Sequence, residues 1–150
     1  YRKMHSLQEL KPLILQWAKE KDLLKIENAD KQRLKLLEEV GETAQAILKG
    51  DKEKCKDGVG DVFVVLIILY SQLGIEFDFD LDAKPLEKYE ELSEQERLLT
   101  LLYYHDAVGF DQLHYFCQEN ELVLVECANL AWNEIKNRTG KTVGGTFIKD

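Results

Sequence analysis

The sequence contains no apolar run long enough to cross a bilayer. Its longest such run, from Val62 to Tyr70, is far shorter than the roughly 20 residues that a membrane-spanning helix needs. No charged leader followed by an apolar stretch and a small-residue cleavage site is recognisable, so the sequence shows no signal peptide. We therefore expect a cytoplasmic protein with no membrane partner.

Cysteine is scarce and basic residues are outnumbered. Cys55, Cys117 and Cys127 are odd in number and show no CxxC spacing, which suits a reducing cytoplasm better than a disulfide framework. A catalytic thiol stays open, although isolated buried cysteines usually only pack. The 20 Lys and Arg against 28 Asp and Glu give a net charge of −8, which argues against a nucleic-acid partner. A polyanionic substrate would need a bound cation or a local basic patch.

What the chain does have is a pattern of two long helices over residues 34–73. Gly50 is expected to end the first helix, Asp51 to cap the second and Gly74 to stop it, so that a short loop makes them antiparallel neighbours. Spacings of three and four residues predict one buried stripe on the first helix. That stripe comprises Leu34, Leu37, Val40, Ala44, Ile47 and Leu48.

Acidic residues recur at helical spacing inside this hairpin of helices. Glu38, Glu39 and Glu42 fall within an arc of about 100° at about 3.6 residues per turn. Asp57 and Asp61 lie one turn apart on the second helix and share a face. Carboxylates that repel one another in an apolar setting need cations, and ligation by oxygen alone favours Mg²⁺ or Mn²⁺. A solvated or ion-paired acidic face is the alternative on these residues alone.

Two blocks of the sequence resemble a known family. The run Glu38-Glu39-Val40-Gly41-Glu42, followed by Gly60-Asp61-Val62, resembles the signature of the all-α nucleoside triphosphate pyrophosphohydrolases, the MazG-like group. Residues 131–141, AWNEIKNRTGK, are similar to the end of many small bacterial and phage members. The resemblance implies an all-α bundle of four to five helices, with a short two-stranded or extended element at most. It also implies a homodimer or homotetramer.

The resemblance further implies an activity and roles for residues. The activity is Mg²⁺-dependent hydrolysis of a nucleoside triphosphate between its α and β phosphates, giving the monophosphate and pyrophosphate and serving nucleotide-pool house-cleaning. Glu39, Glu42 and Asp61 would be metal ligands, and Glu38 would orient or deprotonate the attacking water. The family usually carries Glu-x-x-Asp on the second acidic helix, and here Gly58 stands in place of that Glu. Asp57 is then the substitute ligand.

Further residues are candidates for holding the substrate. Lys35 lies one turn before Glu39 and would meet a phosphate, unless it is an ordinary solvent-facing residue. Basic residues near a helix end complement its dipole, but on so acidic a chain they are also candidates for binding a triphosphate. Trp17 is expected in the core or, as in relatives, stacked on the base. The remaining candidates of the C-terminal block are Asn133, Lys136, Arg138 and Lys141.

Outside the matched blocks, the chain of 150 residues predicts a single domain over residues 1–150 with an insertion at about 76–120. Ser6 and Ser93 each begin a capping-box pattern that opens a helix. Two other functions stay open: a phosphoribosyl-ATP pyrophosphohydrolase-like enzyme, and a catalytically weak nucleotide or metal sensor or helical interaction module. If a missing ligand limits activity, Gly58→Glu should raise it.

Overall fold

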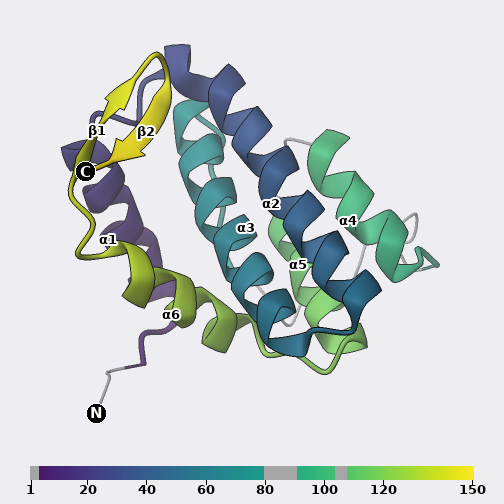
Figure 1. Cartoon of the computed structure of the whole chain (residues 1–150). Helices are drawn as coiled ribbons and strands as arrows, with labels where there is room; N and C mark the ends of the chain where they lie inside the picture. Colours follow the sequence, from purple (N-terminus) through teal and green to yellow (C-terminus); the bar gives the residue numbers. More distant parts are fainter. Residues whose placement is uncertain (1–3, 80–90, 104–107) are drawn as a thin grey trace.

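The computed structural model describes residues 4–79, 91–103 and 108–150, and it confirms the all-α fold class. Within these ranges the structure has six α-helices rather than four or five, together with one small two-stranded sheet (Figure 1). Residues 80–90 and 104–107 of the expected insertion lie outside the described residues. The helices are α1 (Leu7–Glu20), α2 (Ala29–Lys49, after the 3₁₀ turn Ile26–Asn28), α3 (Lys52–Gln72), α4 (Glu94–Tyr103), α5 (Val108–Glu119) and α6 (Leu124–Ile135).

Helices α2 and α3 form the predicted antiparallel hairpin. Gly50 ends α2 with a left-handed φ of 65°, a conformation that glycine adopts without steric cost. The side chain of Asp51 then caps α3 by accepting a hydrogen bond from the Lys54 backbone N–H at 3.1 Å. The two helices therefore run side by side through the middle of the molecule (Figure 1).

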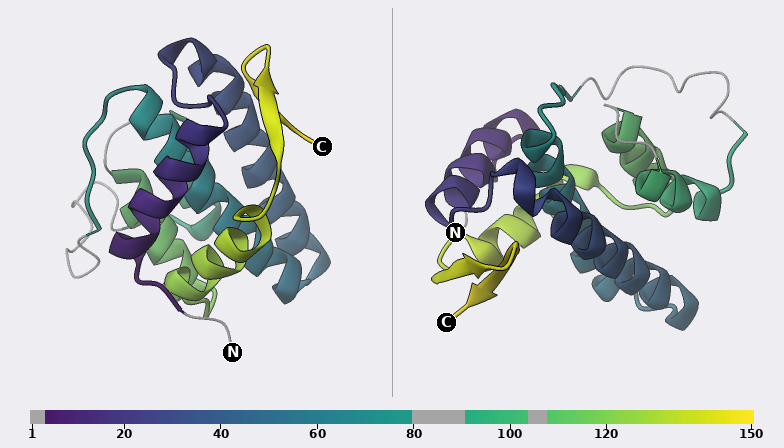
Figure 2. Two further views of the ribbon diagram at one scale, coloured as in Figure 1. Left: turned by 90° about the vertical axis from the view of Figure 1, so that its left-hand side faces the viewer. Right: turned by 90° about the horizontal axis from the view of Figure 1, so that it is seen from above.

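Helix α3 is the centre of the fold. Its second half is apolar on every side, which is typical of a helix that is buried all round. It packs against α1, α2, α5 and α6, and Figure 2 shows α4 and α5 on one side of it with α1 and α6 on the other. Two residues of α3 belong to a cluster of aromatic rings in which neighbouring centroids are 5.0–5.9 Å apart. The cluster comprises Phe63, Tyr70, Phe77, Phe79 and Phe110.

The expected buried stripe of α2 is wrong in part. Leu34, Leu37 and Leu48 are 58%, 53% and 88% exposed, whereas Val40 is buried. The face that packs on α3 instead comprises Gln32, Leu36, Glu39, Val40, Thr43 and Ala46. Both stripes fit a period of 3.6, so apolarity alone favoured the leucines. The face that is buried is the one that lets α2 approach α3 closely, because the small Thr43 on it lies directly against Gly58.

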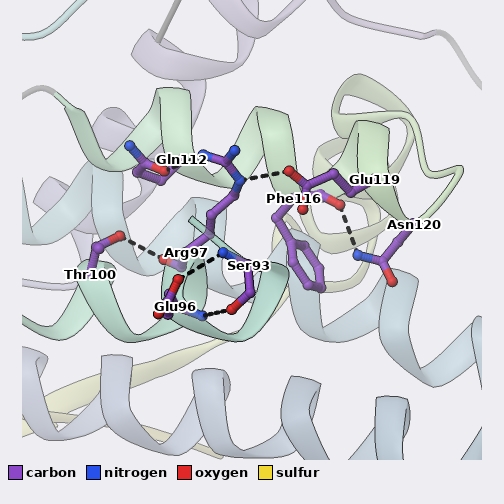
Figure 3. Close-up of polar contacts among 8 residues, drawn as sticks. All are labelled: Ser93, Glu96, Arg97, Thr100, Gln112, Phe116, Glu119 and Asn120. Atoms are coloured by element: carbon purple, nitrogen blue, oxygen red, sulfur yellow. Dashed lines mark hydrogen bonds and ion pairs between the residues drawn. The ribbon is translucent and has the colours of Figure 1, made fainter. Parts of the chain in front are cut away.

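A polar network joins α4 to α5 (Figure 3). Ser93 and Glu96 form the predicted capping box at the start of α4, with hydrogen bonds of 3.2 and 2.8 Å. Arg97, only 4% exposed, donates from Nε to Glu119 at 2.7 Å and from Nη1 to Gln112 at 3.0 Å. A buried guanidinium with charged and polar acceptors fixes the register of these two helices.

The C-terminal tail forms a β-hairpin of β1 (Gly140–Val143) and β2 (Thr146–Lys149), which accounts for the expected two-stranded element. Gly144 and Gly145 make its turn with positive φ angles of 59° and 85°, as a tight hairpin requires. Helix α6 ends at Ile135, and residues 136–139 lead from it into the hairpin. The hairpin lies beside α1 (Figure 2), and Thr142 Oγ1 donates to the Lys21 carbonyl at 2.6 Å. In the described ranges no helix is both long and apolar enough to cross a membrane.

Candidate active site

Three carboxylates meet where α2 faces α3. Glu39, Glu42 and Asp61 each place one oxygen within 4.8 Å of the other two. Glu39 is only 6% exposed, and its Oε2 has no hydrogen-bond partner among the described residues. A buried carboxylate oxygen without a partner is costly unless a cation meets it. An oxygen-only donor set of this kind fits a hard divalent cation.

The protonation behaviour of the cluster reflects this crowding. Burial, with added repulsion from Asp61, raises the pKa of Glu39 to about 7, and the Lys35 ammonium only partly opposes this. Burial, followed by repulsion from Glu134 and Asp57, raises the pKa of Asp61 to about 6. Both groups are harder to ionise than ordinary carboxyls because the cluster holds too little positive charge. A divalent cation would supply it.

Gly58 does not leave room for the glutamate of the family pattern. A Cβ at this position would overlap Thr43 Oγ1 and lie 3.1 Å from Thr43 Cα. Glycine therefore allows α2 and α3 to approach closely just beside the acidic cluster. The expectation that Gly58→Glu restores a missing ligand is not supported, because the new side chain would push the two helices apart.

Asp57, the expected substitute ligand, lies one turn before Asp61 and outside the group of three. It lines a cavity of about 460 Å³ between α2, α3 and α6, which we call the acidic cavity. The acidic cavity also contacts Glu42, Asp61 and, from α6, Glu134. Among the acidic groups, Glu42 and Asp61 border both this cavity and another one beside the β-hairpin.

A second cavity, of about 430 Å³, lies between α2, α3, the end of α6 and the β-hairpin, and we call it the β-hairpin cavity. One wall is acidic and carries the cluster together with Glu38. Basic residues, aliphatic side chains of α3 and two aromatic rings form much of the remaining lining, and the rings of Trp17 and Phe147 meet edge to face with centroids 5.1 Å apart. The basic residues are Lys31, Lys35, Arg138 and Lys149. The cavity therefore offers oxygen ligands, cations and an apolar wall in one place.

Lys35 contacts the two glutamates that follow it on α2, Glu38 and Glu39. Its Nζ lies 2.7 Å from Glu38 Oε1 and 3.4 Å from Glu39 Oε1. Although burial opposes it, the hydrogen bond to Glu38 and the charge of Glu39 raise the pKa of Lys35. Lys35 is therefore a firmly protonated cation at the cavity wall, and Glu38 is an exposed carboxylate held beside the cluster.

The structure brings some of the predicted substrate-binding residues together and leaves others apart. Trp17, Lys35 and Arg138 line the β-hairpin cavity, and Trp17 is buried with an Nε1–H that has no partner among the described residues. Three others are not among the residues that line it: Asn133, Lys136 and Lys141.

Sequence reasoning missed several residues that border the two cavities. Nothing in the sequence around Lys31 separates it from an ordinary solvent-facing helix residue, whereas Phe147 and Lys149 belong to a hairpin whose folded position no local pattern encodes. Glu134 stands inside the matched C-terminal block, next to Asn133. Glu134 shares a face of α6 with Cys127 and Ala131, which pack on α3, and this helical spacing could have indicated that Glu134 also faces α3.

Comparisons with known proteins agree with this geometry. Residues 27–94 match the family model described as the MazG nucleotide pyrophosphohydrolase domain, which confirms the resemblance to the MazG-like group. The chain is 40% identical over 73 residues to an uncharacterized 18.2 kDa protein from the rep-hol intergenic region of Haemophilus phage HP1 (strain HP1c1). That match covers 49% of this chain and 45% of the phage protein, so the chain spans about half the length of this relative. No solved structure matches.

Proposed function

We propose that this MazG-like protein is a nucleoside triphosphate pyrophosphohydrolase that uses Mg²⁺, or Mn²⁺ in its place. It would convert an NTP or dNTP and water to the monophosphate and pyrophosphate, as a house-cleaning enzyme of the nucleotide pool. The observation that carries the proposal is the buried Glu39 oxygen, without a partner among the described residues, within an oxygen-only cluster on the wall of a cavity that also carries basic and aromatic side chains. Neither the acidic cluster nor the basic and aromatic side chains of the cavity would by itself favour a nucleotide as the ligand.

The metal ligands in this proposal are Glu39, Glu42 and Asp61, with Asp57 close by. Bound Mg²⁺ would neutralise phosphate charge and lower the pKa of an attacking water. Glu38 is the group that orients this water and accepts its proton, because it is an exposed carboxylate on the same wall. Lys35, 2.7 Å away, holds the Glu38 carboxylate in place.

Cationic side chains would hold the triphosphate opposite the acidic wall. A chain with a net charge of −8 needs a bound cation or a local basic patch to bind a polyanion, and beside the proposed Mg²⁺ the β-hairpin cavity has such a patch in Lys31, Lys35, Arg138 and Lys149. Trp17 and Phe147 form the apolar wall on which a base would rest. Asn133, Lys136 and Lys141 remain predicted contacts of the C-terminal block.

The exposed leucines of α2 favour a contact between two copies of the chain. Leu34, Leu37 and Leu48 lie at spacings typical of a helix seam, and all three are exposed. We therefore expect a homodimer or homotetramer with a light-scattering mass well above 17.4 kDa. Leu37→Glu should reduce the mass toward that of a monomer, and a clean monomer in the wild type would contradict this contact.

The test of the activity is a panel of all common NTPs and dNTPs, incubated with and without Mg²⁺ and separated by anion exchange. Monophosphate and pyrophosphate that appear only with the metal are the expected products, and the fastest substrate identifies the preferred base and sugar. Phosphoribosyl-ATP in competition with that substrate tests the related hydrolase. Absence of turnover with every nucleotide, despite bound metal, would favour the sensor role, which the replacement of the family glutamate by Gly58 keeps open.

A further inference from the structure

Helix α6 is held against α3 immediately beside the acidic cluster. A Cβ on Gly60 would overlap the Cys127 carbonyl oxygen, and it would lie 2.9 Å from the Cys127 carbonyl carbon and 3.0 Å from Ala131 Cβ. Two helix backbones meet this closely only where one of them carries a glycine. The contact lies one residue before Asp61, so the orientation of α6 determines what faces that carboxylate.

The face of α6 that makes this contact continues to Glu134. Cys127, Ala131 and Glu134 are four and three residues apart, which places them along one side of a helix. Glu134 accordingly lines the acidic cavity together with Glu42, Gly58 and Asp61. Its carboxylate forms none of the ion pairs found among the described residues.

Gly58 stands where the family pattern has a glutamate, so the acidic cavity lacks the carboxylate that this glutamate would supply. Gly58 lines the acidic cavity but packs its α-carbon against Thr43, so a larger side chain would overlap Thr43. Glu134 lines the same cavity from α6 and, like Asp57, lies outside the group of three carboxylates whose oxygens are within 4.8 Å of one another. Among the neighbouring acids, its charge also acts on Asp61 more strongly than that of Asp57.

We propose that Glu134 is the fourth carboxylate of the divalent-cation site, binding the cation or a water attached to it from α6. This site is completed by Glu39, Glu42 and Asp61 from α2 and α3. The unpartnered, buried Oε2 of Glu39 independently indicates that a cation belongs at this cluster. The inference rests on the metal site of the proposed function and not on the hydrolysis itself.

A site built in this way joins three helices instead of two. Cation binding would then hold α6 against α3, and α6 leads directly into the hairpin that carries Phe147 and Lys149. Loss of Glu134 should weaken cation binding without disturbing the metal-free fold, because the change removes a carboxylate that repels Asp61.

The experiment is a titration of the full chain with Mn²⁺, without nucleotide, in which the EPR signal of free Mn²⁺ measures the amount bound. We expect Glu134→Gln to weaken Mn²⁺ binding by about tenfold or more, the scale of losing a supporting carboxylate around a metal. Glu126→Gln is the matched control, since Glu126 is exposed on the same helix and lines neither cavity. Circular dichroism and melting of the metal-free variants test that the fold is intact.

The outcomes separate this inference from the proposed function. Wild-type affinity in Glu134→Gln would overturn the role of Glu134 and leave the enzyme proposal standing. A loss in Asp57→Asn without a loss in Glu134→Gln would also overturn it, and would return the fourth position to Asp57. Weakened binding in Glu134→Gln, with no pyrophosphate release by the wild type, would support the metal site and refute the activity. A wild type that binds no Mn²⁺ would refute both.

Discussion

Replacing Gly60 by alanine should separate α6 from α3 and lower the stability of the whole bundle. The added Cβ would overlap the Cys127 carbonyl oxygen and crowd Ala131 Cβ at 3.0 Å. The first neighbour is backbone, which cannot rotate away as a flexible side chain would. The two helices must therefore move apart, and apolar contacts along α3 would be lost with them.

The size of the effect follows from the crowding. Overpacking of a well-packed core by one methyl group costs about 1–3 kcal/mol, and a backbone neighbour places Gly60→Ala near the upper end. For a chain of this length each kcal/mol corresponds to roughly 2–4 °C in Tm. We therefore expect a fall of roughly 6–12 °C.

Gly41→Ala is the matched control for this prediction. Gly41 is also inside a helix, but nothing lies within 4 Å of a Cβ built there. Alanine should therefore stabilise by about 0.5–1 kcal/mol through helix propensity alone. Thermal unfolding followed by circular dichroism compares the two variants at a concentration where light scattering gives them the same mass. The same change of Tm in both variants, or no fall of Tm in Gly60→Ala, would refute the close α3–α6 contact.

Three further predictions concern the site. The pKa values of Glu39 and Asp61 rise from 4.5 to about 7 and from 3.8 to about 6, so the unfolded chain loses its protons first as the pH increases. Metal-free stability should therefore fall between about pH 4 and pH 7, and urea unfolding of Glu39→Gln should show a smaller fall; an equal fall would contradict the buried charge. Gly58→Glu should lower Tm and leave pyrophosphate release no faster than in the wild type, and a faster rate would contradict the packing of Gly58 on Thr43. Phe147→Ala should raise KM several-fold with little change in kcat, whereas a fall in kcat at constant KM would contradict its place on the base-side wall.

The centre of the fold could be predicted from the sequence because its signals are local. Gly50 and Asp51 mark a helix end and a helix start within two residues, and the acidic spacings follow from the helix period alone. The structure accordingly brings Glu39, Glu42 and Asp61 within reach of one another.

The parts that were predicted wrongly or missed depend on contacts between distant segments. The buried face of α2 is set by how closely Thr43 approaches Gly58, which apolarity does not reveal. Glu134 lines a cavity together with Glu42 and Asp61 because α6 crosses α3 at Gly60. Likewise, the ring of Phe147 packs on that of Trp17, which lies near the other end of the sequence, and no periodicity predicts such a contact.

The most direct test of the central claim is pyrophosphate release by Glu39→Gln and Asp61→Asn beside the wild type, with the best triphosphate from the panel and saturating Mg²⁺. Glu53→Gln serves as the control, because Glu53 is an exposed acid on α3 that pairs only with Lys56 among the described residues. The account predicts that both site variants stay folded and lose nearly all release, while the control keeps it. Full release by either folded site variant would contradict the claim that this carboxylate cluster is the metal centre of the enzyme.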